Sequence, residues 1–390
     1  MPEHPLIYLN NAATTWPKPP EVTEAVQEAL SLPAFGTGRT AGTEGTDYVS
    51  LAREKTAQLF NAEEDEICFT HNATDALNLL IRGFIEKHPH CHVLTTALDH
   101  NSVLRPLHEF AKRGDITLSV IPIDKKTGTI SPKAAADAVT DETKLIVMNH
   151  AGNVTGAVQD VRETARLLHK EDIFLIADGS QSAGHIRCDL KSLGADAFVF
   201  TGHKALFGIT GTGGFRIQES RSEEIEPVRF GGTGTLSGNL YQPREMPERF
   251  EAGTQNFTGL AALAAGISYI EKRGIDEIHE QGMRQSAFLI SELKEEENIV
   301  IHNEHPKVPV ISFAIDGLCP DDIGFILSRK YGVVTRTGLH CAPLVHEAID
   351  GGHGSVRMSL SALTTDEECE AAAAAVREVA ERAASSVRSA

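Results

Sequence analysis

Residues 174–204 read FLIADGSQSAGHIRCDLKSLGADAFVFTGHK, and their pattern decides the fold. Phe174–Ala177 and Ala197–Thr201 are short apolar runs, rich in residues that strands favour, and each run is followed by polar side chains. Apolar runs of this kind are typical of parallel strands that are covered by helices on both faces. The stretch therefore predicts two strands of an α/β fold, with Asp178 and Lys204 at the same edge of the sheet, where such folds bind ligands.

The alternation of apolar runs and amphipathic stretches continues on both sides of this segment. Further strands are predicted at Ile67–Thr70, His92–Thr95, Leu118–Ile121, Leu145–Met148 and Gly214–Ile217, and helices at Tyr48–Asn61, Thr74–Lys87, Val103–Arg113 and Val161–Lys170. This order predicts a large domain built on a mostly parallel seven-stranded sheet.

The last third of the chain follows a different pattern. Residues 231–259 are rich in Gly, Thr, Asn and Pro, which predicts a long loop that is functional or lies at an interface. A smaller α+β domain is predicted beyond it, with a helix at Leu260–Lys294, strands at Val308–Ile315 and Ser355–Ser359, and a last helix from Thr365, where Thr365 and Glu368 are spaced as a capping box. We expect the large domain to span residues 15–265 and the small domain residues 1–14 and 266–390.

Composition narrows the classes of function. The 390 residues include 36 basic and 54 acidic side chains, a net charge of −18 that would repel the phosphates of nucleic acids. The first residues lack a secretory signal pattern, and no apolar run approaches the roughly 18 residues of a membrane span. The six cysteines form no CxxC pair, which argues against disulfides and a metal site. We expect a cytoplasmic protein with no nucleic acid, membrane or metal partner.

Asp178 and Lys204 predict either a structural ion pair or a pyridoxal-phosphate site. A lysine amine bonds covalently to the aldehyde of this cofactor, and a carboxylate keeps the pyridine nitrogen protonated. Either residue alone favours the structural interpretation. Together, with the Gly-rich stretch GITGTGG after Lys204, they favour the cofactor.

A phosphate cradle is expected near the start of the helix at Thr74. Asn72, Ala73 and Thr74 follow a strand, and the first N–H groups of a helix favour an anion. Taken alone, these residues favour an ordinary helix cap at Asn72 or Thr74 over a phosphate site. Thr201 and His203, which flank Lys204, are able to donate to the same phosphate.

His100 and Asn153 also follow predicted strands. An imidazole at His100 is able to stack on the pyridine ring and to move protons near neutral pH, although a lone histidine is more often structural. Asn153 is able to donate to the phenolic oxygen of the cofactor.

The segment RTGLHCAP, residues 336–343, brings a guanidinium, an imidazole and a thiol together in a loop. Neighbouring cations, Arg336 and a protonated His340, would favour the nucleophilic thiolate of Cys341. The other five cysteines are interpreted as small buried apolar residues. Arg357, in a predicted strand, is suited to grip an α-carboxylate with two parallel hydrogen bonds.

These segments carry a resemblance to a known family. The chain resembles the cysteine desulfurase and selenocysteine lyase branch of the class V aminotransferase-like enzymes, which are fold-type I pyridoxal-phosphate enzymes. The matching segments occur in order along nearly the whole chain: YLNNAATT, THNATDALNL, LDHNSVLRPL, NHAGNVTG, ADGSQSAGH, TGHKALFGITGTGG, RFEAGTQN and RTGLHCAP. Asn10 departs from the aspartate that the family usually has.

The resemblance implies a role for each matching residue. Lys204 and Cys341 would be the cofactor-bonding lysine and the persulfide-forming cysteine, and His100 the histidine that stacks on the ring. Thr254 would reach the phosphate in the neighbouring subunit, which implies a homodimer. The remaining residues would bind pyridoxal phosphate (Ala73, Thr74, Asn153, Asp178, Gln181, Thr201, His203) or the substrate (Asn11, Ala12, Arg357).

The activity that the resemblance implies is removal of sulfur from L-cysteine, giving L-alanine and an enzyme persulfide for a protein or small-thiol acceptor. Other enzymes of this fold remain open, namely a selenocysteine lyase, a C–S lyase, an aminotransferase or an epimerase. A non-catalytic sulfur carrier or cofactor-binding regulator is a further alternative. The presence of the lysine, aspartate and cysteine together disfavours it.

Overall fold

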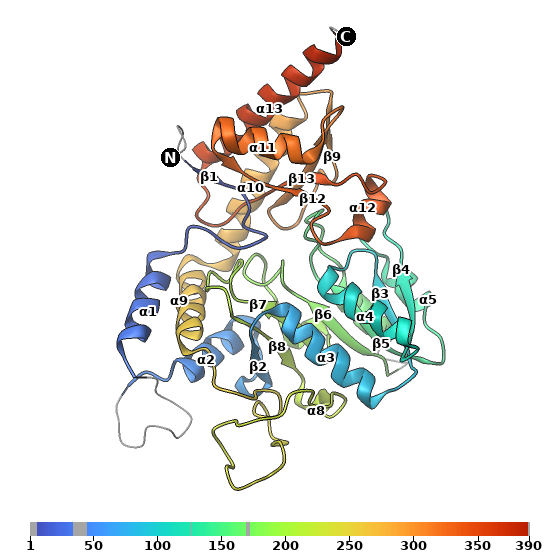
Figure 1. Ribbon diagram of the computed structural model, residues 1–390, viewed down its shortest axis with the longest axis vertical. Helices are drawn as coiled ribbons and strands as arrows, with labels where there is room; N and C mark the ends of the chain where they lie inside the picture. Colours follow the sequence, from blue (N-terminus) through green and yellow to red (C-terminus); the bar gives the residue numbers. More distant parts are fainter. Residues whose placement is uncertain (1–5, 34–44, 126, 169–171, 389–390) are drawn as a thin grey trace.

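The computed structural model describes residues 6–33, 45–125, 127–168 and 172–388 (Figure 1). Its strands are β1 (Ile7–Tyr8), β2 (Ile67–Thr70), β3 (His92–Thr96), β4 (Thr117–Ile121), β5 (Thr143–Asn149), β6 (Phe174–Asp178), β7 (Ala197–Thr201), β8 (Gly213–Ile217), β9 (Ile299–Ile301), β10 (Val310–Ile315), β11 (Val333–Val334), β12 (Arg336–Gly338) and β13 (Ser355–Ser359).

The α-helices surround these strands. They are α1 (Pro20–Ser31), α2 (Tyr48–Phe60), α3 (Ala73–Lys87), α4 (Asn101–Arg113), α5 (Pro132–Asp137), α6 (Val161–Leu168), α7 (Leu190–Leu193), α8 (Glu219–Ser222), α9 (Phe257–Arg273), α10 (Ile275–Leu293), α11 (Pro320–Tyr331), α12 (Pro343–Ile349) and α13 (Asp366–Arg388). None of the helices in these described ranges has the length and apolarity that crossing a membrane requires.

The larger sheet has seven strands in the order β2-β8-β7-β6-β5-β3-β4. The pairs β4–β3, β3–β5, β5–β6 and β6–β7 are parallel, and β8 runs antiparallel to both of its neighbours. The predicted α/β fold with a mostly parallel seven-stranded sheet is therefore confirmed. All seven predicted strands exist, and β2 and β7 have the predicted bounds.

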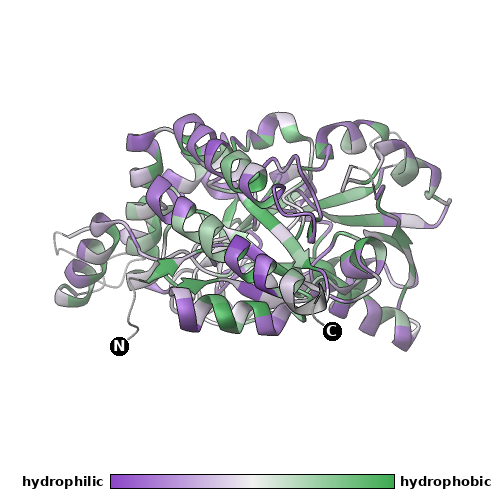
Figure 2. Ribbon diagram, turned by 90° about the horizontal axis from the view of Figure 1, so that it is seen from above, coloured by the Kyte–Doolittle hydropathy of each residue, from purple (hydrophilic) through white to green (hydrophobic). Residues whose placement is uncertain are grey.

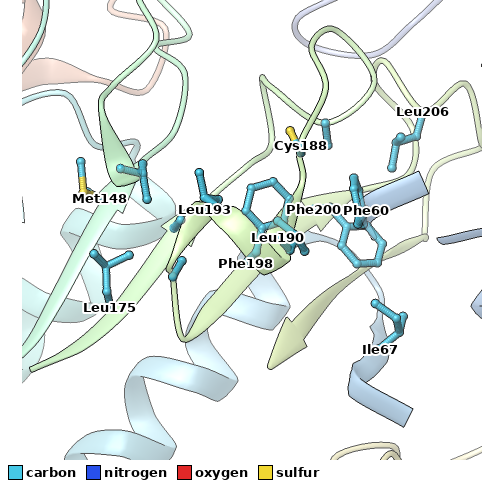
Figure 3. Packing of buried hydrophobic residues seen from close by; sticks show 14 of the residues in the cluster. Phe60, Ile67, Met148, Leu175, Cys188, Leu190, Leu193, Phe198, Phe200 and Leu206 are labelled. Atoms are coloured by element: carbon cyan, nitrogen blue, oxygen red, sulfur yellow. The ribbon is translucent and has the colours of Figure 1, made fainter. Parts of the chain in front are cut away.

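Strand residues alternate between two separate hydrophobic cores, one on each face of this sheet. Leu175 and Phe198 pack into the core that includes α2 and α9, while Phe174 and Val199 pack into the core that includes α3 and α4. Figure 3 shows the first core, where Phe198 and Phe200 lie next to Phe60 of α2. Figure 2 shows the corresponding distribution of hydropathy, with apolar strands inside and polar helix faces outside. Burial on both faces explains why these strands are continuous apolar runs.

A second sheet has four antiparallel strands in the order β12-β13-β10-β9. Its core packs against α10, α11 and α13, in the upper half of Figure 1. The predicted capping box is present, because Thr365 N–H donates to Glu368 and Glu368 N–H donates to Thr365 Oγ1 at 3.1 Å.

The predicted single helix Leu260–Lys294 is two helices, α9 and α10. Gly274 separates them with φ +88°, a conformation that glycine adopts without the steric penalty of a side chain. Helix α9 packs against α1 and α2, whereas α10 packs against α13. The predicted loop 231–259 ends earlier than expected, because Asn256 caps α9.

The predicted division at residue 265 falls inside α9. The seven-stranded sheet lies within residues 15–265 and the four-stranded sheet within residues 266–390. The assignment of two domains with these bounds stays a prediction.

Candidate active site

A cavity of about 560 Å³ lies where the strands of the large sheet end. Its polar lining comes from both sheets, with Asp178 at the end of β6, Lys204 after β7, and Arg336 and Arg357 on β12 and β13. The cavity is also lined by Ala12, Ala13, Asn72, Ala73, Thr74, His100, Ser102, Asn149, Ala151, Asn153, Ser180, Gln181, Thr201, His203, Thr210 and Gly211. Most of the sequence-predicted site residues therefore meet in one place.

Asp178 and Lys204 follow neighbouring parallel strands, as the sequence predicts. Asp178 is 5% exposed, and its Oδ1 accepts hydrogen bonds from Ser180 N–H at 2.9 Å and Ser180 Oγ at 2.6 Å. Burial lowers the pKa of Lys204 from 10.5 to about 8, against the opposing charge of Asp178. A buried amine with a lowered pKa is a good nucleophile near neutral pH.

The backbone at Lys204 is held by the N-terminal segment. Thr15 Oγ1 donates to the Lys204 carbonyl at 2.5 Å, and Thr14 Oγ1 donates to the His203 carbonyl at 3.1 Å. Lys18 Nζ donates to the same His203 carbonyl at 3.0 Å. These hydrogen bonds fix the turn from which the Lys204 side chain enters the cavity.

The lowered pKa of Lys204 predicts how the cofactor-free protein takes up an aldehyde. Only the unprotonated Nζ attacks, so the attachment rate should rise with pH, with its inflection near pH 8, and level off above it. Because Asp178 raises this pKa, the inflection should move to lower pH in Asp178→Asn. Stopped-flow absorbance with added pyridoxal phosphate measures both profiles. An inflection at about pH 10, where an exposed lysine titrates, would contradict the assignment.

The first turn of α3 forms one wall of the cavity, at Ala73 and Thr74. The first N–H groups of a helix have no partner within it, and they favour an anion. His203 lines the same cavity, and burial, followed by the charges of Lys204 and Lys18, lowers the pKa of its imidazole to about 4. Its Nδ1 is buried and has no hydrogen-bond partner among the described residues. This wall therefore fits a phosphate.

His100 is the N-cap residue of α4, and its Nδ1 accepts the N–H of Ser102 at 3.0 Å. We therefore assign its ring proton to Nε2. Burial and the charge of Lys204 lower the pKa of His100 to about 4, so that the imidazole is neutral at pH 7. Its role as a stacking or proton-moving residue stays a prediction.

Gln181 and Asn153 line the cavity, but each donates a side-chain N–H to a backbone carbonyl of the protein. Gln181 Nε2 donates to the Ala12 carbonyl at 3.0 Å, and Asn153 Nδ2 donates to the His340 carbonyl at 2.8 Å. These bonds connect the cavity wall with the N-terminal segment and the Cys341 loop. Their predicted contact with the cofactor's phenolic oxygen stays a prediction.

Two guanidinium groups line the side of the cavity that the small sheet forms, which we call the roof. They belong to Arg336 and Arg357, which are cross-strand neighbours on β12 and β13. Arg357 is 1% exposed, and its Nη1 donates to the Asn153 carbonyl at 2.9 Å. Its Nε and Nη2 are buried without a hydrogen-bond partner in the described part of the chain. A buried guanidinium with two unused donors fits a carboxylate ligand.

Cys341 lies in the turn after β12, where φ is +58°. The Arg336 side chain donates to its Sγ at 3.3 Å, which brings the thiol to the Arg336 side of the cavity. The prediction that a protonated His340 assists this thiol is wrong. Burial, and then the charge of Arg357, lower the pKa of His340 to about 2, so this imidazole is neutral.

The other cysteines differ from Cys341 in their surroundings. Cys68, Cys91, Cys188 and Cys369 are buried, and burial raises the pKa of each thiol. Cys319 is exposed at the start of α11, which corrects the expectation that all five are buried. In the described residues, no group of histidine, cysteine and acidic side chains is arranged to hold a metal ion.

Three predicted site residues are not among those that line the cavity: Cys341, Asn11 and Thr254. Cys341 lies next to the cavity, because its Sγ contacts Arg336, which lines it. Asn11 is buried, and its Nδ2 donates to the carbonyls of Tyr8 and Ser359. Thr254 is exposed on the long loop and lies against a different pocket. Ser102, Ser180 and Thr210 line the cavity but were not predicted, because an isolated hydroxyl residue, whether in a helix or a loop, carries no sequence signal.

A lysine and a carboxylate at strand ends, with a helix start that fits a phosphate, are the arrangement expected of a fold-type I pyridoxal-phosphate enzyme. The sequence model of the class V aminotransferase family matches residues 7–371 of the chain. A probable cysteine desulfurase of Methanothermobacter thermautotrophicus is 32% identical over 96% of this chain and 94% of its own. One of Pyrococcus abyssi is 34% identical over 94% and 92%. The solved cysteine desulfurase of Thermococcus onnurineus is 30% identical, with a TM-score of 0.87 over 96% and 95%. The chain belongs to the class V aminotransferase family, in its cysteine desulfurase branch.

Proposed function

We propose that the protein is a pyridoxal-phosphate-dependent cysteine desulfurase. It removes sulfur from L-cysteine, releases L-alanine and holds the sulfur as a persulfide on Cys341. The observation that carries this proposal is the contact between Arg336 and Cys341 Sγ at 3.3 Å, on the roof of the cavity that Lys204 and Asp178 line. The relatives in the cysteine desulfurase branch support the same activity.

The residues present fit the cofactor. The first turn of α3, with Thr201 and His203, would hold its phosphate, Lys204 would bond to its aldehyde and Asp178 would keep its ring nitrogen protonated. When bound, pyridoxal phosphate withdraws electrons from the α-carbon of an amino acid. The unused donors of Arg357 would bind the substrate α-carboxylate, and Lys204 Nζ, released when the substrate amine takes its place, would accept the α-proton.

The sulfur step takes place between two sulfur atoms. The thiolate of Cys341 attacks the sulfur of L-cysteine, the S–S bond forms, and the bond between that sulfur and the β-carbon breaks. The β-carbon leaves with the electron pair and gains a proton, and the return of a proton to the α-carbon completes L-alanine. The products, alanine and Cys341 persulfide, contain all the atoms of the cysteine and the thiol, so no external oxidant is required.

A product assay tests this function against the other enzymes of the fold. With one equivalent of L-cysteine per active site and no other thiol, the desulfurase should release up to one alanine per active site and no free sulfide. With an added thiol reductant, alanine and sulfide should form continuously in equal amounts. Sulfide released without alanine would indicate a C–S lyase, and the absence of both alanine and sulfide would indicate an aminotransferase or epimerase.

Replacement of Asp178 with asparagine should leave the fold intact and lower turnover by several orders of magnitude. The amide is similar in size, but it cannot hold a proton on the ring nitrogen by charge. Steady-state alanine formation and circular dichroism measure the two effects. Ser180→Ala, which removes one donor to Asp178 but keeps the carboxylate, is the matched control. Nearly unchanged turnover in Asp178→Asn would make this residue structural.

We further propose a homodimer, in which Thr254 donates to the phosphate of the partner's cofactor. Thr254 is exposed on a loop that also exposes Leu240 (97%) and Tyr241 (83%), and exposed apolar side chains of this size favour an interface. Analytical sedimentation should give a dimer. Thr254→Ala should weaken cofactor binding without dissociating the dimer. A fully active, cofactor-loaded monomer would contradict this proposal.

The sulfur acceptor is proposed to be a protein or a small thiol. We propose that the enzyme works in the cytoplasm, where its thiols stay reduced.

A further inference from the structure

Cys341 and His340 occupy an unusual backbone conformation. Their φ angles are +58° and +50°, and side chains other than glycine are strained in this left-handed region. Such a conformation persists only where the surroundings hold it, and it is concentrated at functional sites. The contacts of this turn therefore decide where the thiol lies.

Two hydrogen bonds hold the backbone of the turn from the side of the large sheet. Asn153 Nδ2 donates to the His340 carbonyl at 2.8 Å, and Asn101 N–H donates to the Cys341 carbonyl at 2.8 Å. From the other side, the His340 ring is buried, with its Nε2 at 3.0 Å from Ser355 Oγ. Cys341 therefore directly follows a residue, His340, whose imidazole is buried and held in place.

A second imidazole supports the first. His346 lies on α12, the helix that begins two residues after Cys341, and it is completely buried. Its ring centroid is 5.4 Å from that of His340. The sequence offers no reason to single out His346, because the spacing HCAPLVH resembles no catalytic motif.

The carboxylate of Asp350 fixes the His346 ring. His346 Nδ1 donates to Asp350 Oδ2 at 2.6 Å, and Asp350 Oδ1 accepts the N–H of Gly352 at 3.0 Å. His302, which follows β9, places its Nε2 3.7 Å from the same Oδ2. A nearly buried carboxylate thus orients α12 relative to the edge of the small sheet. A buried carboxylate is costly without hydrogen-bond partners. Removal of the His346 donor would therefore strongly disturb the contact of Asp350 with the edge of the small sheet.

We infer that His346 and Asp350 are positioning residues for Cys341: their hydrogen bond holds His340, and through it the strained turn that keeps Sγ beside Arg336. The inference rests on the proposed function, in which Cys341 receives the sulfur. Neither residue lines the cavity, so neither contacts the substrate or the cofactor. Their removal therefore changes the sulfur step and leaves binding intact.

The test compares His346→Leu, Asp350→Ala and the double variant, all loaded with cofactor. Each should form the Cys341 persulfide at least 10-fold more slowly than the unchanged protein, with the same affinity for L-cysteine and the same cofactor absorbance. The double variant should be no slower than the singles, because both act through one hydrogen bond. His346→Asn, whose Nδ2 replaces the lost donor, should recover most of the rate.

A second readout does not depend on turnover. Alkylation of Cys341 by iodoacetamide, followed by mass spectrometry without L-cysteine, should slow at least three-fold in His346→Leu, because Arg336 no longer stabilises the attacking sulfur. His92→Leu is the matched control. His92 is also buried (6% exposed) and bonds through both ring nitrogens to Thr143 and Ser119, at the opposite end of β3 from the site.

The outcomes distinguish a failure of the positioning role from a failure of the proposed function. Equal alkylation rates in His346→Leu and the unchanged protein, or equal slowing in His92→Leu, would overturn the positioning role. A loss of cofactor absorbance or L-cysteine affinity in parallel with the rate would overturn it as well. If Cys341→Ser still transfers sulfur, the proposed function fails, whereas the alkylation result still reports on the turn.

Discussion

Replacement of Lys204 with alanine should abolish covalent attachment of the cofactor and reduce turnover by at least about 10³-fold, because Lys204 would also act as the base. Its Nζ is the amine that the structure buries in the cavity beside Asp178, with a pKa lowered to about 8. Borohydride reduction followed by peptide mass analysis should find the cofactor on the Lys204 peptide of the unchanged protein. The same treatment of the variant should find no adduct.

Lys18 provides a demanding control for this prediction. Burial also lowers its pKa to about 8, and its Nζ lies 3.0 Å from the His203 carbonyl, close to the same turn. Lys18→Ala should nevertheless keep the adduct on Lys204, since Lys18 does not line the cavity. An adduct on Lys18 in the Lys204→Ala protein would overturn the assignment of the attachment site.

Replacement of Cys341 with serine should eliminate sulfur transfer while L-cysteine still binds. The hydroxyl has nearly the size of the thiol, so the strained turn and its contacts with Asn101 and Asn153 should survive. A serine hydroxyl without a base beside it does not attack sulfur at neutral pH. The change in cofactor absorbance on addition of L-cysteine should persist, and sulfide production with a reductant should fall to background.

Cys319 is the matched control for Cys341. It is exposed at the start of α11, so it is accessible to reagents without lining the cavity. Cys319→Ser should transfer sulfur at the normal rate. Sulfur transfer by Cys341→Ser at the rate of the unchanged protein would instead indicate a lyase or transaminase on this scaffold.

The large sheet is predictable from the sequence because its strands are buried on both faces. Residues such as Phe174–Ala177 therefore form uninterrupted apolar runs, which mark strands more clearly than alternating patterns do. Helix α1 and strands β11 and β12 have no such signal. They are short, partly exposed or polar, and tertiary contacts determine them. The break at Gly274 was missed because helical periodicity continues on both sides of a single glycine.

The site is predictable to the extent that its residues follow strands. Asp178 and Lys204 do so, and parallel pairing of β6 and β7 brings them to one edge. The neutral state of His340 was not predictable, because it depends on burial against β13 and on the nearby charge of Arg357. The neighbouring guanidiniums of Arg336 and Arg357 were missed as a pair for a similar reason, since only the register of β12 and β13 reveals it.

The most direct test of the account is the mass of the Cys341 peptide after a single exposure of the cofactor-loaded protein to L-cysteine, followed by alkylation and digestion. We predict one added sulfur atom on that peptide, no added sulfur on the peptides of the other five cysteines, and one alanine released per added sulfur. An unmodified Cys341 in a protein that has released alanine and sulfide would contradict the account.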